Sequence, residues 1–226
     1  MKRMTPGLLL VATRNPHKLA EIRRIFALPG LTLVGAGEIP GLPDVEEDGD
    51  TFEANAIKKA VSLSRASGLW TLADDSGLEV DALGGAPGVY SSRYAGTHGD
   101  YAANNRKLLA ALSCARRRSA RFRCAVALAT PDGRVETVEG RCEGRIVPAG
   151  RGTGGFGYDP LFVPRGGRLT FGEMSDAAKD RLSHRGRALE AARRRWGRKL
   201  RAALCAQAGP GPRPAIGTRQ KRAQGS

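Results

Sequence analysis

Apolar residues occur along the chain in short unbroken runs and then at helical spacing, which predicts strands that alternate with helices. Residues 7–12 form a short apolar run typical of a buried strand. Apolar positions three and four apart follow over residues 19–26, and Asn15 before Pro16 is the cap expected at the start of that helix. Residues 31–34 predict a second short strand.

The middle of the chain repeats this order. Asp50 and Glu53 have the spacing of a capping box, so we expect a helix to open there and to end at Gly68. The apolar residues 69–73 then predict a strand that ends in the sequence Asp-Asp-Ser-Gly of residues 74–77.

A hairpin and more helices are expected in the second half. The same rules predict these elements in chain order: a helix over 101–113, strands over 122–128 and near 135–138, a glycine-rich loop over 150–157, a strand over 161–163, and helices capped by Ser175 and Ser183. Strands and helices that alternate early, followed by a hairpin, indicate an α/β fold with a mixed sheet.

Composition restricts the class of protein. The chain of 226 residues is 41% hydrophobic and 26% charged, in the ordinary range of a folded soluble protein. Its longest apolar run, residues 8–12, is far shorter than the ~20 residues of a membrane span, and no cleavage pattern of a signal peptide follows it. The four cysteines contain no Cys-x-x-Cys pair, so we expect neither a disulfide framework nor a zinc site, and a reducing cytoplasm fits best.

The net charge of +15 is concentrated near the C-terminus. Residues 187–226 contain 11 Lys and Arg against one acidic residue. We therefore expect a domain over residues 1–204, followed by a basic and disordered tail over residues 205–226. A nucleic-acid-binding surface is the alternative, but no interleaving of basic and aromatic residues accompanies the charge, so no specific nucleic acid is expected.

Two segments carry the chemistry expected of a phosphate and metal site. The turn over residues 13–18 joins a strand to a helix N-terminus, where backbone N–H groups and the helix dipole favour an anion. Asp74 and Asp75 follow an apolar strand, and paired carboxylates at a strand end suit Mg²⁺. One acid of the run over residues 44–50 would complete that metal site.

Two further segments suit a flat ligand. Gly155 and Gly157 bracket Phe156, so that the backbone can approach a ligand while the ring stacks on it. His184 and Arg185 lie in the first turn of a predicted helix, where a cation needs an anion or acceptor to balance it.

Five segments in order resemble the inosine triphosphate pyrophosphatase family, over almost the whole chain except the tail. They are ATRNPHK, TFEANAIKKA, ADDSGLEVDALGGAPGVYSSRYAG, GTGGFGYDP and SHRGRAL. The resemblance implies an elongated α/β fold with two lobes flanking a central nucleotide cleft, a homodimer, and Mg²⁺-dependent hydrolysis of non-standard purine nucleoside triphosphates such as ITP, dITP and XTP. The products would be the monophosphate and pyrophosphate, which would keep deaminated purines out of DNA and RNA.

The resemblance also implies roles for individual residues. It implies Mg²⁺ near Glu46 and Asp75, with Glu47 as the neighbouring alternative to Glu46, and Asp75 as the group that accepts a proton from water. It implies that the triphosphate lies on Thr13, Arg14, Asn15, Pro16, His17 and Lys18. It further places these residues around the phosphates or base: Ser76, Phe156, Gly157, Tyr158, Asp159, Lys179, His184 and Arg185. A Maf-type nucleotide pyrophosphatase, similar in chemistry but different in preferred base, is the alternative enzyme.

Overall fold

A single sheet of six strands organises the chain. The computed structural model describes residues 7–207. Its strands lie in the spatial order β2-β1-β3-β4-β5-β6, with β1 parallel to β2 and β3 and the remaining pairs antiparallel. Their bounds are β1 Gly7–Val11, β2 Leu31–Gly35, β3 Thr71–Val80, β4 Ser119–Ala129, β5 Val135–Ile146 and β6 Phe162–Pro164. The predicted mixed-sheet α/β fold is confirmed.

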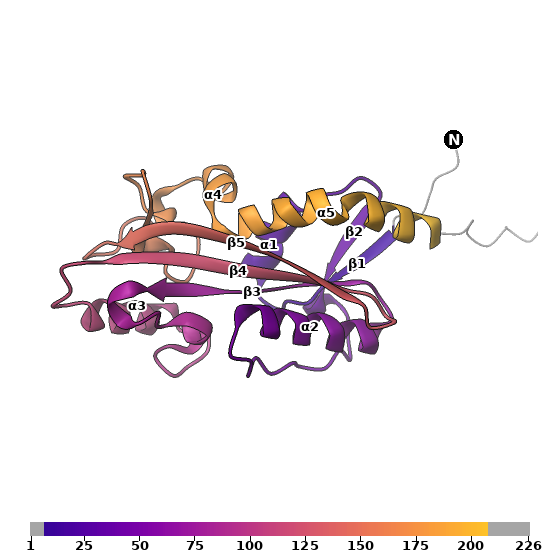
Figure 1. Ribbon diagram of the computed structural model, residues 1–226, viewed down its shortest axis with the longest axis horizontal. Coiled ribbons are helices and arrows are strands. Elements are labelled where there is room, and N and C mark those ends of the chain that lie inside the picture. The colour runs from indigo at the N-terminus through magenta and orange to yellow at the C-terminus, as the bar shows by residue number, and fades with distance from the viewer. Residues whose placement is uncertain (1–6, 208–226) are drawn as a thin grey trace, which may run out of the picture.

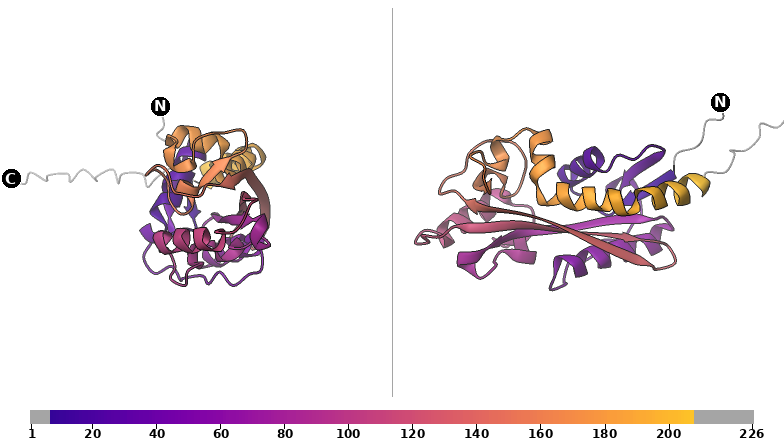
Figure 2. Two further views of the ribbon diagram at one scale, coloured as in Figure 1. Left: turned by 90° about the vertical axis from the view of Figure 1, so that its left-hand side faces the viewer. Right: turned by 45° about the horizontal axis from the view of Figure 1, so that its top comes forward.

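Helices cover both faces of the sheet along an elongated molecule (Figure 1). The α-helices are α1 Pro16–Ile25, α2 Phe52–Ser67, α3 Tyr101–Ala111, α4 Asp176–Leu182 and α5 His184–Gln207. Short 3₁₀ helices occupy Ala36–Glu38, Asp81–Leu83, Gly88–Arg93, Asp159–Leu161 and Phe171–Glu173. In Figures 1 and 2, α5 runs along one face of the sheet, while α2 lies against the opposite face.

The apolar core is divided between the two ends of the sheet. At the end that holds β1 and β2, one cluster packs α1 and α5 on one face, and a second cluster packs α2 on the other. A third cluster, at the far end, joins α3, β6 and the adjoining loops around Phe122 and Phe162. On β3, Leu72 and Ala73 belong to the first two clusters and Leu78 to the third, so the polar residues 74–76 lie between these cores. This division gives the two predicted lobes.

Local signals in the sequence marked most helix ends correctly. The side chains of Asn15, Ser175 and Ser183 accept hydrogen bonds from backbone N–H groups of the first turns of α1, α4 and α5. The cap of α2 was predicted wrongly, because Thr51 rather than Asp50 accepts the N–H of Ala54 at 3.0 Å. Gly68 ends α2 in the left-handed conformation, with φ of 69°.

The strand that carries Asp74 and Asp75 is longer than predicted. The prediction ended it at residue 73, whereas β3 continues to Val80 and holds both aspartates in its interior. The physical reason is that β4 pairs with β3 over its whole length, from Thr71 opposite Ala129 to Val80 opposite Ala120. Its other neighbour, β1, pairs only as far as Leu72. Beyond that point, the edge of β3 on the side of β1 has no further strand partner among the described strands, and residues 85–91 cover its far end through an isolated bridge between Glu79 and Pro87 and a hydrogen bond from Leu78 N to Ser91 Oγ.

The end of α5 overlaps the segment predicted as tail. Helix α5 continues to Gln207, three residues into the segment predicted as tail, and the remainder of that segment lies outside the described residues. None of the helices within residues 7–207 is long and apolar enough to cross a membrane.

Candidate active site

Two neighbouring cavities open where β1 ends and β3 continues. The first, here the polar cavity, has a volume of about 210 Å³ and is lined by the loop after β1, by α2 and by the acidic loop before it. The second, the aromatic cavity, has about 80 Å³ and is lined by Phe122, Phe156, Tyr158 and the cationic groups of α4 and α5. Both include Ser76, Ser92 and Tyr101 in their walls. A ligand with a charged end and a flat end would therefore fit across the two.

The loop after β1 offers its side chains, rather than free backbone N–H groups, as hydrogen-bond donors to the polar cavity. Asn15 Oδ1 accepts the N–H groups of His17 and Lys18, at 2.9 and 3.2 Å, and Pro16 has no N–H. The sequence interpretation assigned these amides to phosphate, but they cap the helix instead. Thr13, Arg14, Asn15 and Lys18 line the cavity, so hydroxyl, amide and cationic side chains are the donors there.

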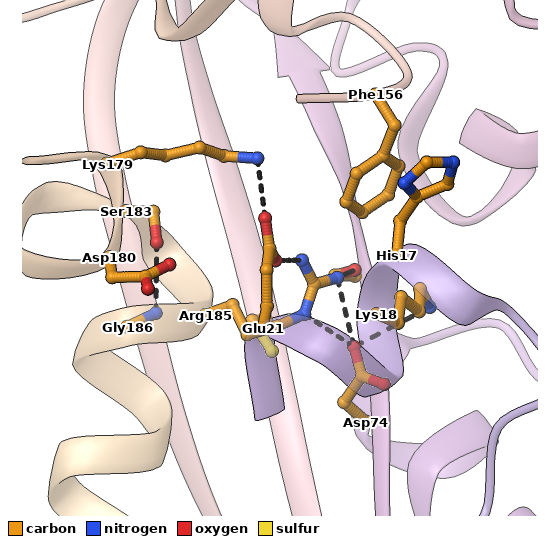
Figure 3. Close-up of polar contacts among 12 residues, drawn as sticks. His17, Lys18, Glu21, Asp74, Phe156, Lys179, Asp180, Ser183, Arg185 and Gly186 are labelled. Atoms are coloured by element: carbon orange, nitrogen blue, oxygen red, sulfur yellow. Dashed lines mark hydrogen bonds and ion pairs between the residues drawn. The ribbon is translucent and has the colours of Figure 1, made fainter. Parts of the chain in front are cut away.

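Asp74 and Asp75 point to opposite faces of the sheet, because successive side chains of a strand alternate. Asp74 faces α1 and α5, where its Oδ2 accepts two hydrogen bonds from Arg185 at 3.1 Å and lies 3.5 Å from Lys18 Nζ (Figure 3). Asp75 faces α2, where its Oδ2 accepts from Asn55 Nδ2 at 3.0 Å. The two carboxylates therefore do not act as a pair on one ligand, contrary to the sequence interpretation, and only Asp75 lines the polar cavity.

A buried ionic network surrounds Asp74. Burial would raise the pKa of Asp74, but Lys18 and Arg185 outweigh it and hold the pKa well below its usual range. Arg185 also donates to Glu21 and, at 2.8 Å, to Ser76 Oγ. Glu21 accepts in turn from Lys179 Nζ at 2.6 Å, so α1, β3, α4 and α5 meet in one network (Figure 3). The cation in the first turn of α5 is thus balanced by anions.

Glu21 is a residue that the sequence analysis missed. Its side chain is 7% exposed; burial raises the pKa of Glu21, but Arg185 and Lys179 outweigh it and hold the pKa below the usual value. The signal in the sequence was its position beside Ile22 on the inward face of α1, where a charged residue interrupts the apolar stripe. Such an interruption indicates a buried partner of opposite charge.

Asp75 has acidic and basic neighbours in the polar cavity. Lys59 Nζ lies 3.8 Å from Asp75 Oδ1 and forms a short ion pair with Glu47. Burial raises the pKa of Asp75, and Lys59 and Lys18 reduce that rise only in part. The family resemblance implied Glu46 here, with Glu47 as the alternative; Glu46 is exposed and does not line the cavity, whereas Glu47 does. The structure therefore brings Glu47 rather than Glu46 to Asp75.

The donor set fits Mg²⁺. Glu47 and Asp75 supply carboxylate oxygens, the ligands that Mg²⁺ prefers, and both lie beside the ammonium of Lys59. Within residues 7–207, no group of three or more His, Cys, Asp or Glu side chains is gathered as a metal site. Two carboxylates are the number with which Mg²⁺ commonly keeps water and substrate phosphate as its other ligands.

Lys59 and Asn55 were also missed. Both lie on the buried face of α2 among Phe52, Ala56 and Ala60, so they interrupt an apolar stripe as Glu21 does. Lys59 Nζ also donates to the backbone oxygen of Asp74 at 2.7 Å. This helix therefore places one cation and one amide at the carboxylate end of the polar cavity.

The aromatic cavity has a neutral histidine in its wall. His184 is 4% exposed and stacks on Phe122, with ring centroids 4.6 Å apart. Burial lowers the pKa of His184 well below its usual value, and Arg185 and Lys179 lower it further. Its Nδ1 is buried and has no hydrogen-bond partner among the described residues. A ligand that offers a hydrogen bond there would satisfy it.

Phe156 and its neighbours form the other side of that cavity. The N–H of Phe156 donates to Asp159 Oδ2 at 2.8 Å, and Tyr158 Oη donates to the backbone oxygen of Ser91 at 2.9 Å. The carboxylate of Asp159 also forms an ion pair with Lys179. Tyr158 and Asp159 therefore anchor the loop, while Phe156 presents its ring to the cavity.

Most of the predicted site residues lie together. The polar cavity contains Thr13, Arg14, Asn15, Lys18, Asp75 and Ser76. The aromatic cavity contains Ser76, Phe156, Gly157, Tyr158, Asp159, Lys179, His184 and Arg185. Pro16, His17 and Glu46 line neither of them.

The fold and the site together indicate an α/β protein with adjoining polar and aromatic cavities, and comparisons with known proteins identify its family. Residues 9–195 match the Ham1 family, and the chain belongs to it. The dITP/XTP pyrophosphatase of Desulforamulus reducens is 51% identical over 186 residues, which are 81% of this chain and 92% of that protein. The dITP/XTP pyrophosphatase of Nocardia farcinica is 52% identical over 82% of this chain and 93% of its own length. The solved structure of a HAM1 protein from Coxiella burnetii, 38% identical, superposes with a TM-score of 0.77 over 87% of this chain and 99% of that one. The resemblance found in the sequence is confirmed.

Proposed function

We propose that this protein hydrolyses non-standard purine nucleoside triphosphates, such as dITP, ITP and XTP, to the monophosphate and pyrophosphate. The observation that carries the proposal is the pair of joined cavities, one with cations and carboxylates and the other with aromatic rings. A triphosphate suits the first and a purine base the second. The names of the relatives at about half identity support the same substrate class. Removal of these nucleotides would keep deaminated purines out of DNA and RNA.

The residues of the polar cavity would bind and orient the triphosphate. Lys18, Arg14 and Thr13 offer positive charge and donors to the phosphate oxygens. Glu47 and Asp75 would hold Mg²⁺, which would neutralise charge on the triphosphate. Asp75 would also accept a proton from the attacking water, because its carboxylate lines the cavity in which the triphosphate would lie. Cleavage between the α and β phosphates would release pyrophosphate.

The aromatic cavity would select the base. Hypoxanthine and xanthine carry an oxygen at position six, where adenine carries an amino group. With its hydrogen on Nδ1, neutral His184 would donate to that oxygen but would face another donor in adenine. An unmatched buried donor costs ~1–3 kcal/mol, which corresponds to about a fivefold to hundredfold discrimination against ATP. Arg185 contributes less freely, because it is already bonded to Asp74, Glu21 and Ser76.

A panel of nucleoside triphosphates tests the proposal directly. Pyrophosphate release should be efficient with dITP, ITP and XTP, weak with ATP, and dependent on added Mg²⁺. A His184→Phe variant keeps the stacking on Phe122 and should narrow the ratio between ITP and ATP. Equal hydrolysis of ATP and ITP by the wild-type protein would refute the proposed specificity, and a preference for another base would favour the Maf-type alternative.

A homodimer, which the family resemblance implies, and a cytoplasmic location, which the spacing of the cysteines favours, complete the proposal. The nucleic-acid alternative depends on the basic C-terminal residues and leaves the two cavities without a role. Salt-sensitive binding of RNA or DNA without pyrophosphate release would favour that alternative.

A further inference from the structure

Phe156 lies in a loop that provides its ring with little support. Residues 150–157 contain five glycines, and residues 151–155 are exposed. The glycines on either side of Phe156 have positive φ, 69° at Gly155 and 63° at Gly157. The hydrogen bond from the Phe156 N–H to Asp159 holds the backbone but leaves the ring free to rotate. The orientation of the ring therefore depends on the side chains beside it.

His17 provides a flat partner for that ring. The two rings are stacked, with centroids 5.4 Å apart and an angle of 18° between their planes. Lys179 Nζ and Arg185 Cζ lie 4.9 and 5.6 Å from the Phe156 centroid. Figure 3 shows these two cations on one side of the ring and His17 on the other. Because Phe156 lines the aromatic cavity and His17 does not, the imidazole supports the ring from outside the cavity.

The position of His17 is set by the loop that would bind the triphosphate. Its N–H donates to the cap Asn15 at 2.9 Å, so the residue is held in the first turn of α1. The next residue, Lys18, lines the polar cavity. One turn of helix therefore directs a cation toward the triphosphate position and an aromatic ring toward Phe156.

We infer that His17 is a positioning residue for base binding, which holds the Phe156 ring in the orientation that the purine meets. The inference rests on the proposed function, because it assigns the base to the aromatic cavity. A stacked aromatic pair is worth about a twofold to tenfold change in affinity. Without the imidazole, the ring loses its stacked partner and keeps only the tilted contact with Tyr101 and the cations of Lys179 and Arg185, so the purine must order it further on binding. The loss should appear in KM and leave kcat unchanged, because His17 does not line the polar cavity in which the phosphates would react.

Steady-state hydrolysis of dITP by a set of matched variants tests this inference. His17→Gln removes the ring but keeps a polar side chain, and we expect a KM raised about twofold to tenfold, with kcat and the thermal unfolding midpoint unchanged. His17→Phe restores a stacking ring and should return KM to the wild-type value. In a Phe156→Leu background, His17→Gln should cause no further rise in KM, because His17 affects base binding only through its contact with the Phe156 ring.

Each opposite result overturns the inference. An unchanged KM in His17→Gln would show that the stacking contributes nothing. A raised KM in His17→Phe would show that the imidazole acts by charge or hydrogen bonding. A full effect of His17→Gln in the Phe156→Leu background would show that His17 acts on the triphosphate directly. Each of these results assumes that the wild-type protein hydrolyses dITP, so it would overturn the role of His17 and leave the proposed function intact. If the wild-type protein bound no purine triphosphate, both the proposed function and the inference would be refuted.

Discussion

The buried carboxylate of Glu21 offers a strong test of the ionic network. Its oxygens accept from Lys179 and Arg185, whose side chains are only 4% and 2% exposed. Glu21→Gln keeps the size of the side chain and one acceptor oxygen, but removes the negative charge. Two buried cations then share the remaining carboxylates of Asp74 and Asp159. We expect the folded state to be destabilised.

The size of the effect follows from the burial. Breaking a buried ion pair by removing one partner costs about 3–5 kcal/mol. Because Asp74 and Asp159 still balance the cations, we expect Glu21→Gln to lower the free energy of unfolding by about 2–3 kcal/mol. For a domain of this size, this corresponds to a fall of roughly 5–10 °C in Tm.

The effect should depend on pH with a defined sign. The folded state holds the pKa of Glu21 below its ordinary value of 4.5, since Arg185 and Lys179 outweigh the rise caused by burial. The carboxylate therefore contributes its full stability above about pH 4.5 and loses it as the pH falls through the folded pKa. The difference between wild type and variant should be complete at pH 7 and should shrink in acid.

Urea unfolding followed by circular dichroism measures this difference, and Glu190 supplies a matched control. Glu190 also pairs with two cations, Arg193 and Arg194, but its side chain is 39% exposed. An exposed pair contributes about 0–1 kcal/mol, so Glu190→Gln should change the free energy of unfolding only slightly. If Glu21→Gln were no more destabilising than Glu190→Gln, the proposed role of the buried network would be wrong.

Three further predictions concern the site. Asp75→Asn should lower pyrophosphate release at least ~10²-fold, since it removes a general base and a metal ligand together, and near-normal turnover would contradict both roles. Glu47→Gln should raise the Mg²⁺ concentration needed for half-maximal activity while Glu46→Gln leaves it unchanged, and the reverse result would move the metal ligand to Glu46. The fold lowers the pKa of His184, so this side chain takes up a proton below about pH 6.5 in the unfolded chain but not in the folded protein. As the pH falls below that value, the free energy of unfolding of the wild type should therefore decrease by up to ~1.4 kcal/mol per pH unit more than that of His184→Phe. Urea unfolding at pH 7 and pH 5 measures that difference, and parallel losses in both proteins would show that His184 does not cause it.

The amino-acid sequence by itself determined the local elements and the family. Short apolar runs and helical spacing depend on neighbours within a few residues, so β1, α1 and the hairpin of β4 and β5 could be predicted. The caps Asn15, Ser175 and Ser183 were correct for the same reason, because a cap bonds within its own first turn. The ordered motifs also identified the site segments, including Asp75, Phe156 and Arg185.

Only the tertiary structure decided how those residues face one another. The length of β3 depends on its pairing with β4, a contact about 50 residues away in sequence, and this pairing puts Asp74 and Asp75 in a strand interior on opposite faces. Glu47 rather than Glu46 reaches Asp75, because α2 places Lys59 beside both of them. The contacts of Glu21 with Lys179 and of His17 with Phe156 each join segments more than 130 residues apart. Periodicity records which face of its own element a residue occupies, whereas the partner across that face is set by the packing of whole elements.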